Sequence, residues 1–177
     1  SFIGVGTSAL NSCRPPMPSS GRTATTSTMT PMPPIQCMKV RHRLIEIGKA
    51  EVVADGTDVA LLGLGTMFEM AERTKALLEE KGLSVALINP RFIKPMDTAV
   101  IEEYARKCRV LCTFEDHVLM NGFGAAVIDH LHTQGIHTPV VRIGWPDEFV
   151  EHGKPDILRE LHGLTAAAAV EKVLSRF

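Results

Sequence analysis

The chain has 177 residues, of which 45% are hydrophobic and 22% are charged, with 19 basic and 20 acidic side chains. This balance suits one globular domain with a buried core and is hardly enough for two. The formal net charge of −1 argues against nucleic acid as the main partner. No apolar run reaches the length of about 18–20 residues that a membrane-spanning helix requires, which argues against a membrane protein.

Residues 1–40 differ in composition from the rest of the chain. They are rich in Ser, Thr, Pro, Gly and Met, and they show no hydrophobic period of either kind. Such a segment lacks the apolar surface needed to offset the entropy of ordering. We therefore expect residues 1–40 to be disordered or non-native, and residues 41–177 to form the folded domain. A transit peptide fits the Ser/Thr content, but arginine is sparse and no amphipathic pattern is present.

From residue 41 the pattern is regular, and strands and helices alternate. In chain order, it predicts a strand in 45–56, a strand in 58–65, a helix in 66–82, a strand in 83–90, a helix in 96–108, a strand in 109–116, a helix in 122–135, a strand in 138–146 and helices in 154–163 and 164–177. The run in 58–65 is continuously apolar, as expected of a strand covered on both faces.

The ends of several helices carry their own signals. Thr66 and Glu69 have capping-box spacing, and Gly82 is placed to end that helix. Asp97 and Thr165 are predicted to cap two later helices. Short connections between alternating strands and helices predict an α/β domain of three layers, with a mainly parallel sheet of about five strands flanked by helices.

In such sheets, ligands usually lie at the carboxyl ends of the strands. The sequence GLGTMF (63–68) half resembles a dinucleotide-binding turn, but Phe68 stands where a third glycine belongs, so a plain glycine turn is preferred. Arg91, Lys94 and Asp97 share one loop between a strand and a helix. Two cations there can bind a phosphate. Arg91 can equally form an ion pair with a carboxylate of a neighbouring loop, and this structural or interface interpretation is favoured.

The sequence FEDHVLMNGFGAAV (114–127) places Glu115, Asp116 and His117 before a loop with Gly122 and Gly124. In an extended chain, Glu115 and His117 share one face while Asp116 points to the other. A Glu–His pair can perform acid–base chemistry, but such pairs also occur in many polar loops without a catalytic role. A metal site would need further ligands, which no local motif supplies. The glycines are expected to let the chain turn into the next helix.

The cysteines and the remaining motifs add no strong catalytic signal. No nucleophile elbow, phosphate-binding loop or C-x-x-C pair is present. Cys108 and Cys112 border an apolar segment and are interpreted as buried free thiols, which favours a reducing compartment such as the cytosol.

Taken in order, GLGTM, NPRFIKPMD, FEDHVLMNGFGAAV and IGWPDEFVEHGKPDILRELHGL resemble the C-terminal domain of 1-deoxy-D-xylulose-5-phosphate synthase, in the thiamine-diphosphate-dependent transketolase superfamily. The resemblance covers residues from about 41 to 177. It implies a homodimeric transferase that condenses pyruvate with glyceraldehyde 3-phosphate and starts the non-mevalonate isoprenoid pathway. It also implies a cytoplasmic enzyme, or a plastid one in a photosynthetic eukaryote.

The resemblance further implies that two preceding domains hold thiamine diphosphate and Mg²⁺, while the third domain mainly packs against them and helps to form the dimer. This chain would then supply no catalytic, cofactor-binding or metal-binding residue, and it would be inactive alone. The matching loops would be structural or interface elements near the active site; their residues are Arg91, Lys94, Asp97, Glu115, Asp116, His117, Gly122 and Gly124.

Residues 1–40 depart completely from this family's pattern. One hypothesis is that they are a frame-shifted translation of the end of the preceding domain, and the alternative is a low-complexity linker or a fusion scar. Two other functions remain open for the whole chain. They are a free-standing interaction or regulatory domain of the same superfamily, and a fragment of a 2-oxoacid dehydrogenase β subunit, which the GWPDEF…GKPD ending disfavours.

Overall fold

The computed structural model describes residues 45–177. The predictions made for residues 1–40 lie outside the described residues. The strands are β1 (Glu51–Ala54), β2 (Val59–Gly63), β3 (Val85–Asn89), β4 (Val110–Val118) and β5 (Val140–Trp145). The helices are the short 3-10 turn η1 (Gly65–Met67), α1 (Phe68–Glu79), α2 (Thr98–Lys107), α3 (Phe123–Thr133), α4 (Pro155–Leu161) and α5 (Ala166–Leu174).

The strands form one five-stranded sheet in the order β1-β3-β2-β4-β5. Strands β2 to β5 run parallel, and β1 pairs antiparallel with β3 at one edge. This confirms the predicted α/β domain with a mainly parallel sheet. Every residue of β2 is buried, as its continuously apolar sequence predicted.

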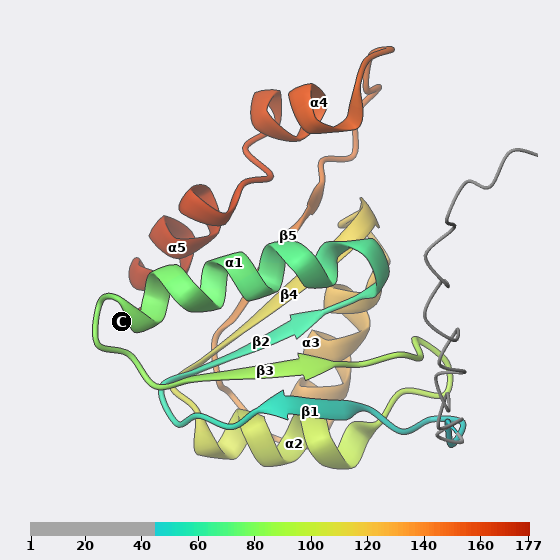
Figure 1. Ribbon diagram of the computed structural model, residues 1–177. Coiled ribbons are helices and arrows are strands. Elements are labelled where there is room, and N and C mark those ends of the chain that lie inside the picture. The colour runs from blue at the N-terminus through green and yellow to red at the C-terminus, as the bar shows by residue number, and fades with distance from the viewer. Residues whose placement is uncertain (1–44) are drawn as a thin grey trace, which may run out of the picture. The chain divides into compact units, whose positions relative to one another are not determined.

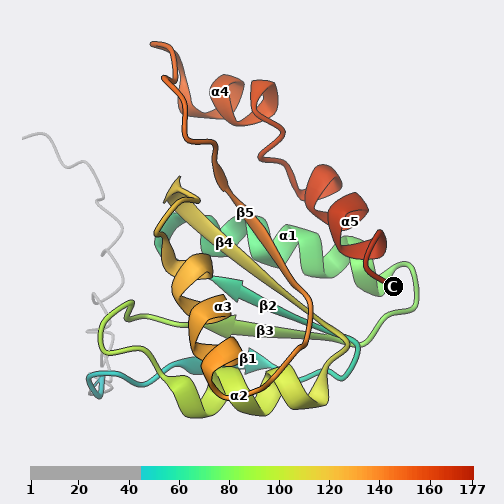
Figure 2. The same ribbon diagram turned by 180° about the vertical axis from the view of Figure 1, so that it is seen from behind.

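Helices cover both faces of the sheet, as Figures 1 and 2 show. On one face, α1 and α5 pack over a core that includes Leu61, Leu78, Phe114 and Val173. On the other face, α2 and α3 enclose a second core around Ile88 and other apolar side chains. Because the central strands are parallel, the carboxyl ends of β2, β3, β4 and β5 meet at one edge of the sheet.

Most predicted helix ends are confirmed. The Asp97 carboxylate accepts the backbone N–H of Val100 at the start of α2, and the Thr165 hydroxyl accepts that of Ala168 at the start of α5. Gly82 has a φ of +84° just beyond α1, a conformation that glycine adopts without strain. No helix among residues 45–177 is long and apolar enough to cross a membrane.

The capping box predicted at Thr66 and Glu69 is wrong. Helix α1 begins at Phe68, after the turn η1, and no side chain caps its first residues. The Thr66 hydroxyl instead donates a hydrogen bond to Asp116, 50 residues further along the chain. A tertiary partner has therefore displaced a local one.

Helix α4 differs from the other helices because it buries none of its residues. In Figures 1 and 2 it lies beyond the carboxyl end of β5, apart from the layers that enclose the sheet.

Candidate functional site

The polar triplet of the sequence forms the end of β4, at the carboxyl edge of the sheet. Glu115 and His117 lie on one face of this strand, with the His117 Nε2 atom 3.3 Å from a Glu115 carboxylate oxygen. Asp116 points to the opposite side, toward Arg159. The predicted alternation is confirmed, although the triplet belongs to the strand and the turn follows it.

Glu115 is a fully buried carboxyl group beneath a half-exposed imidazole. Its two oxygens each lie 3.2 Å from the backbone N–H of Gly124, so the side chain serves as a cap for the first turn of α3. Burial raises the pKa of Glu115. The Gly124 N–H and the nearby His117 and Arg142 oppose this rise without cancelling it.

The glycines of the loop are needed for close approach. A Cβ atom on Gly122 would lie 2.4 Å from a Glu115 oxygen, and one on Gly124 would lie 2.4 Å from the Thr113 hydroxyl. The left-handed position in the turn belongs to Asn121, with a φ of +55°, whereas Gly122 has an ordinary φ of −80°. The expectation that the glycines let the chain turn is thus corrected, since they make room for the side chains of β4 and β5.

Asp116 joins three elements that are distant in sequence. Its carboxylate accepts hydrogen bonds from the Thr66 hydroxyl at 2.8 Å, the Trp145 indole N–H at 2.8 Å and the Arg159 guanidinium at 3.0 Å. Partial burial acts to raise the pKa of Asp116, but the Trp145 and Thr66 hydrogen bonds and the Arg159 charge together hold it below its ordinary value. Asp116 therefore ties α4 to the end of the sheet.

The loop after β3 separates the three residues that the sequence grouped there. Arg91, at a φ of +59°, forms an ion pair with Glu51 of β1. Asp97 caps α2 and also accepts the backbone N–H of Ala50 at 2.9 Å. Lys94 instead lines a cavity of about 360 Å³ beside His117. Arg91 thus takes the structural role, pairing with a carboxylate on an adjacent strand.

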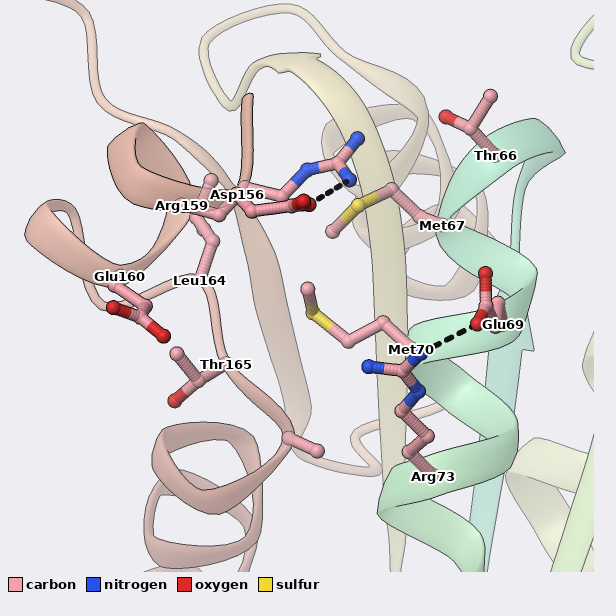
Figure 3. Close-up of a pocket in the computed structure, with 11 residues that line it drawn as sticks. Thr66, Met67, Glu69, Met70, Arg73, Asp156, Arg159, Glu160, Leu164 and Thr165 are labelled. Atoms are coloured by element: carbon pink, nitrogen blue, oxygen red, sulfur yellow. Dashed lines mark hydrogen bonds and ion pairs between the residues drawn. The ribbon is translucent and has the colours of Figure 1, made fainter. Parts of the chain in front are cut away.

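Two further hollows flank Asp116. One, of about 310 Å³, lies between α1 and the α4–α5 connection, and Figure 3 shows ion pairs at its rim between Arg73 and Glu69 and between Arg159 and Asp156. The other, of about 490 Å³, lies between the ends of β4 and β5 and α4. No local sequence pattern predicts this grouping, because the residues that meet there are separated by dozens of positions.

The arrangement supports limited chemistry on its own. Among the described residues, no three His, Cys, Asp or Glu side chains converge as a metal site would require. Cys108 and Cys112 are free and buried, as predicted. Burial raises the pKa of Cys108 to about 11 and that of Cys112 further, so both stay protonated and unreactive at neutral pH. The Glu115–His117 pair at the end of β4 is a candidate proton-transfer group at the carboxyl edge.

Comparison with known proteins agrees with this fold. The family model described as the transketolase C-terminal domain matches residues 48–168. The chain is 49% identical over 140 residues to the 1-deoxy-D-xylulose-5-phosphate synthase of Acidobacterium capsulatum, and 50% identical over 137 residues to that of Methylacidiphilum infernorum. These alignments cover 79% and 77% of this chain but only 22% of each relative, so the chain spans about a fifth of their length.

A solved structure has the same architecture. It is described as a split gene transketolase in an inactive beta4 tetramer, and it matches with a TM-score of 0.69 and 32% sequence identity. The match covers 75% of this chain and 43% of that one. With the matched family model spanning well over half of the sequence, the chain belongs to the family of transketolase C-terminal domains.

Proposed function

We propose that the chain serves as the C-terminal domain of a 1-deoxy-D-xylulose-5-phosphate synthase. The observation that carries the proposal is identity of 49–50% to two such enzymes over 140 and 137 residues, more than three quarters of this chain. The reaction would condense pyruvate with glyceraldehyde 3-phosphate, with loss of carbon dioxide, to make the precursor of isoprenoids and thiamine. The role of this domain would be to pack against the rest of the enzyme and to support a homodimer.

The described residues fit a supporting role better than a cofactor-binding one. Both acidic side chains at the end of β4 are already engaged, Glu115 with α3 and Asp116 with three partners. Neither of these two carboxylates is therefore placed to hold Mg²⁺ and a diphosphate. Thiamine diphosphate and Mg²⁺ would be bound by the part of the enzyme that the relatives have in addition, where the cofactor supplies the carbanion chemistry.

Calorimetry tests this division of roles. The full 177-residue chain is titrated with thiamine diphosphate in the presence of Mg²⁺, and a full-length synthase from Acidobacterium capsulatum serves as the positive control. We expect heat of binding for the control alone. Micromolar binding to the 177-residue chain would contradict the proposal that the cofactor is held elsewhere.

A second arrangement is favoured by one specific comparison. The similar structure belongs to a split gene transketolase, so the chain could act as a separately encoded partner of a cofactor-binding protein. The gene neighbourhood separates the two arrangements. An adjacent reading frame encoding a G-D-G…N motif favours a divided synthase, whereas a solitary gene favours a free-standing interaction or regulatory domain.

A further inference from the structure

The segment from Pro146 to Leu161, here called the α4 lobe, exposes large apolar side chains. Phe149 is 96% exposed, Ile157 54% and Leu161 70%. No residue of α4 is buried, whereas α1 and α5 each bury three. A seven-residue helix is unstable alone in water, and apolar packing is what normally stabilises such a helix. The lobe therefore has the composition of a surface that another molecule covers.

A groove lies between the lobe and the end of the sheet. It has a volume of about 490 Å³ and runs between the ends of β4 and β5 and the lobe. Its apolar walls are Val118, Trp145, Val150 and Leu158. Val118 is itself 40% exposed, although it is the last residue of a central strand. An apolar side chain from a partner could enter here.

The rim of the lobe is strongly acidic. Exposed carboxylates gather within it, at Asp147, Glu148, Glu151, Asp156 and Glu160. Its cations are Lys154 and Arg159, and Arg159 is already paired with Asp116 at 3.0 Å and with Asp156 at 3.9 Å.

This charge distribution selects the kind of partner. A two-fold contact between two copies of the lobe would place like charges face to face, which costs several kcal/mol. An apolar segment bordered by Lys and Arg would instead complement the apolar side chains of the lobe and the charge of its acidic rim.

We propose that the α4 lobe is the docking surface for a basic-rimmed apolar segment in the cofactor-binding part of the synthase. The inference rests on the proposed function, because it takes that part of the enzyme as the partner. Arg159 and Asp116 hold the lobe in place against the sheet, and Phe149 and Leu161 supply the apolar contact. The acidic rim sets orientation and the rate of association.

The test measures binding between two proteins by calorimetry. One is the 177-residue chain, and the other is the part of the Acidobacterium capsulatum synthase that lies outside the 140 aligned residues. The double variant Phe149→Ser/Leu161→Ser is compared with Ile47→Ser, which removes an apolar side chain that is 74% exposed elsewhere. We expect the double variant to weaken binding by tenfold or more, roughly the loss of one interface hot spot, and the control to bind within about twofold of the parent chain.

A charge reversal tests the rim separately. The variant Glu151→Lys/Glu160→Lys is expected to weaken binding and to reduce its salt dependence, while Glu72→Lys/Glu80→Lys, at exposed positions within α1 and directly after it, leaves both unchanged. All four side chains are exposed, so thermal unfolding followed by circular dichroism should be unchanged in each variant.

The outcomes separate the two proposals. Binding by the parent chain that survives both lobe variants overturns the docking surface and leaves the proposed function standing. A parent chain that does not bind at all overturns both. Self-association of the 177-residue chain that Phe149→Ser/Leu161→Ser abolishes would assign the lobe to a second copy, and would also overturn the inference.

Discussion

Replacing Asp116 by alanine should lower the free energy of unfolding by about 2 kcal/mol. The change removes the hydrogen bonds from Thr66 and Trp145, for which about 1 kcal/mol each is typical, and the charged bond from Arg159, for which about 1.5–3 kcal/mol is typical. The Asp116 side chain is 35% exposed, and solvent screening roughly halves such a sum. Asp116→Asn keeps one oxygen that can accept the Trp145 indole N–H and an amide N–H that the Thr66 hydroxyl can accept, but it removes the charge, so about half the loss is expected.

The assay is urea unfolding of the full chain, followed by far-ultraviolet circular dichroism. Fluorescence gives a second readout, because Trp145 is the chain's single tryptophan and donates its indole N–H to Asp116. The pKa of Asp116 is lowered from 3.8 in the folded chain, so the carboxylate contributes fully to the free energy of unfolding above pH 3.8. This contribution is lost as the pH falls through the lower pKa of the folded state. The difference in free energy of unfolding between the parent chain and Asp116→Ala should therefore become smaller in acid. A loss under about 0.5 kcal/mol at pH 7, or an equal loss for Asp116→Asn, would refute the reasoning.

Three further predictions concern the buried groups. Gly124→Ala should destabilise the fold by about 1–3 kcal/mol in urea unfolding, because the new Cβ would lie 2.4 Å from the Thr113 hydroxyl; an unchanged midpoint would show that the loop relaxes freely. The pKa of Glu115 is raised in the folded chain, so the protonated side chain contributes fully to the free energy of unfolding below its ordinary pKa of 4.5. This contribution is lost as the pH rises through the pKa of the folded state. The parent should therefore lose stability relative to Glu115→Gln over that rise. A parallel pH dependence in both proteins would contradict this. Cys108 and Cys112 should resist iodoacetamide at pH 8 in the native chain and react after unfolding, as read by mass spectrometry; rapid native labelling of Cys112 would show that it is not buried.

Much of the fold follows from local pattern. The continuous apolar run of β2 predicted a strand buried on both faces, and Asp97 was correctly placed as the cap of α2. The period of two in an extended chain also predicted correctly that Glu115 and His117 share a face. These features depend on neighbouring residues, which a sequence displays directly.

The features that were missed depend on tertiary contacts. Thr66 has an ideal local capping partner, yet its hydroxyl bonds to Asp116, because the parallel sheet brings the ends of β2 and β4 side by side. Arg159 reaches the same carboxylate across 43 positions of sequence. The spacing of residues in α4 predicts a helix but says nothing of what covers it.

Roles that depend on other parts of an enzyme stay predictions. Lys94 and His117 line one cavity at the carboxyl edge, which is where a neighbouring domain would meet this one. Their contacts across such an interface rest on the proposed function, whereas the domain boundary near residue 41 stays a prediction from composition.

Reconstitution of activity tests the central proposal most directly. The 177-residue chain and the cofactor-binding part of the Acidobacterium capsulatum synthase are purified separately, then mixed with pyruvate, glyceraldehyde 3-phosphate, thiamine diphosphate and Mg²⁺. Formation of 1-deoxy-D-xylulose 5-phosphate is followed by mass spectrometry. We predict product from the mixture and none from the 177-residue chain alone. Product from that chain alone, or a mixture no more active than the cofactor-binding part by itself, would contradict its assignment as the supporting domain of this synthase.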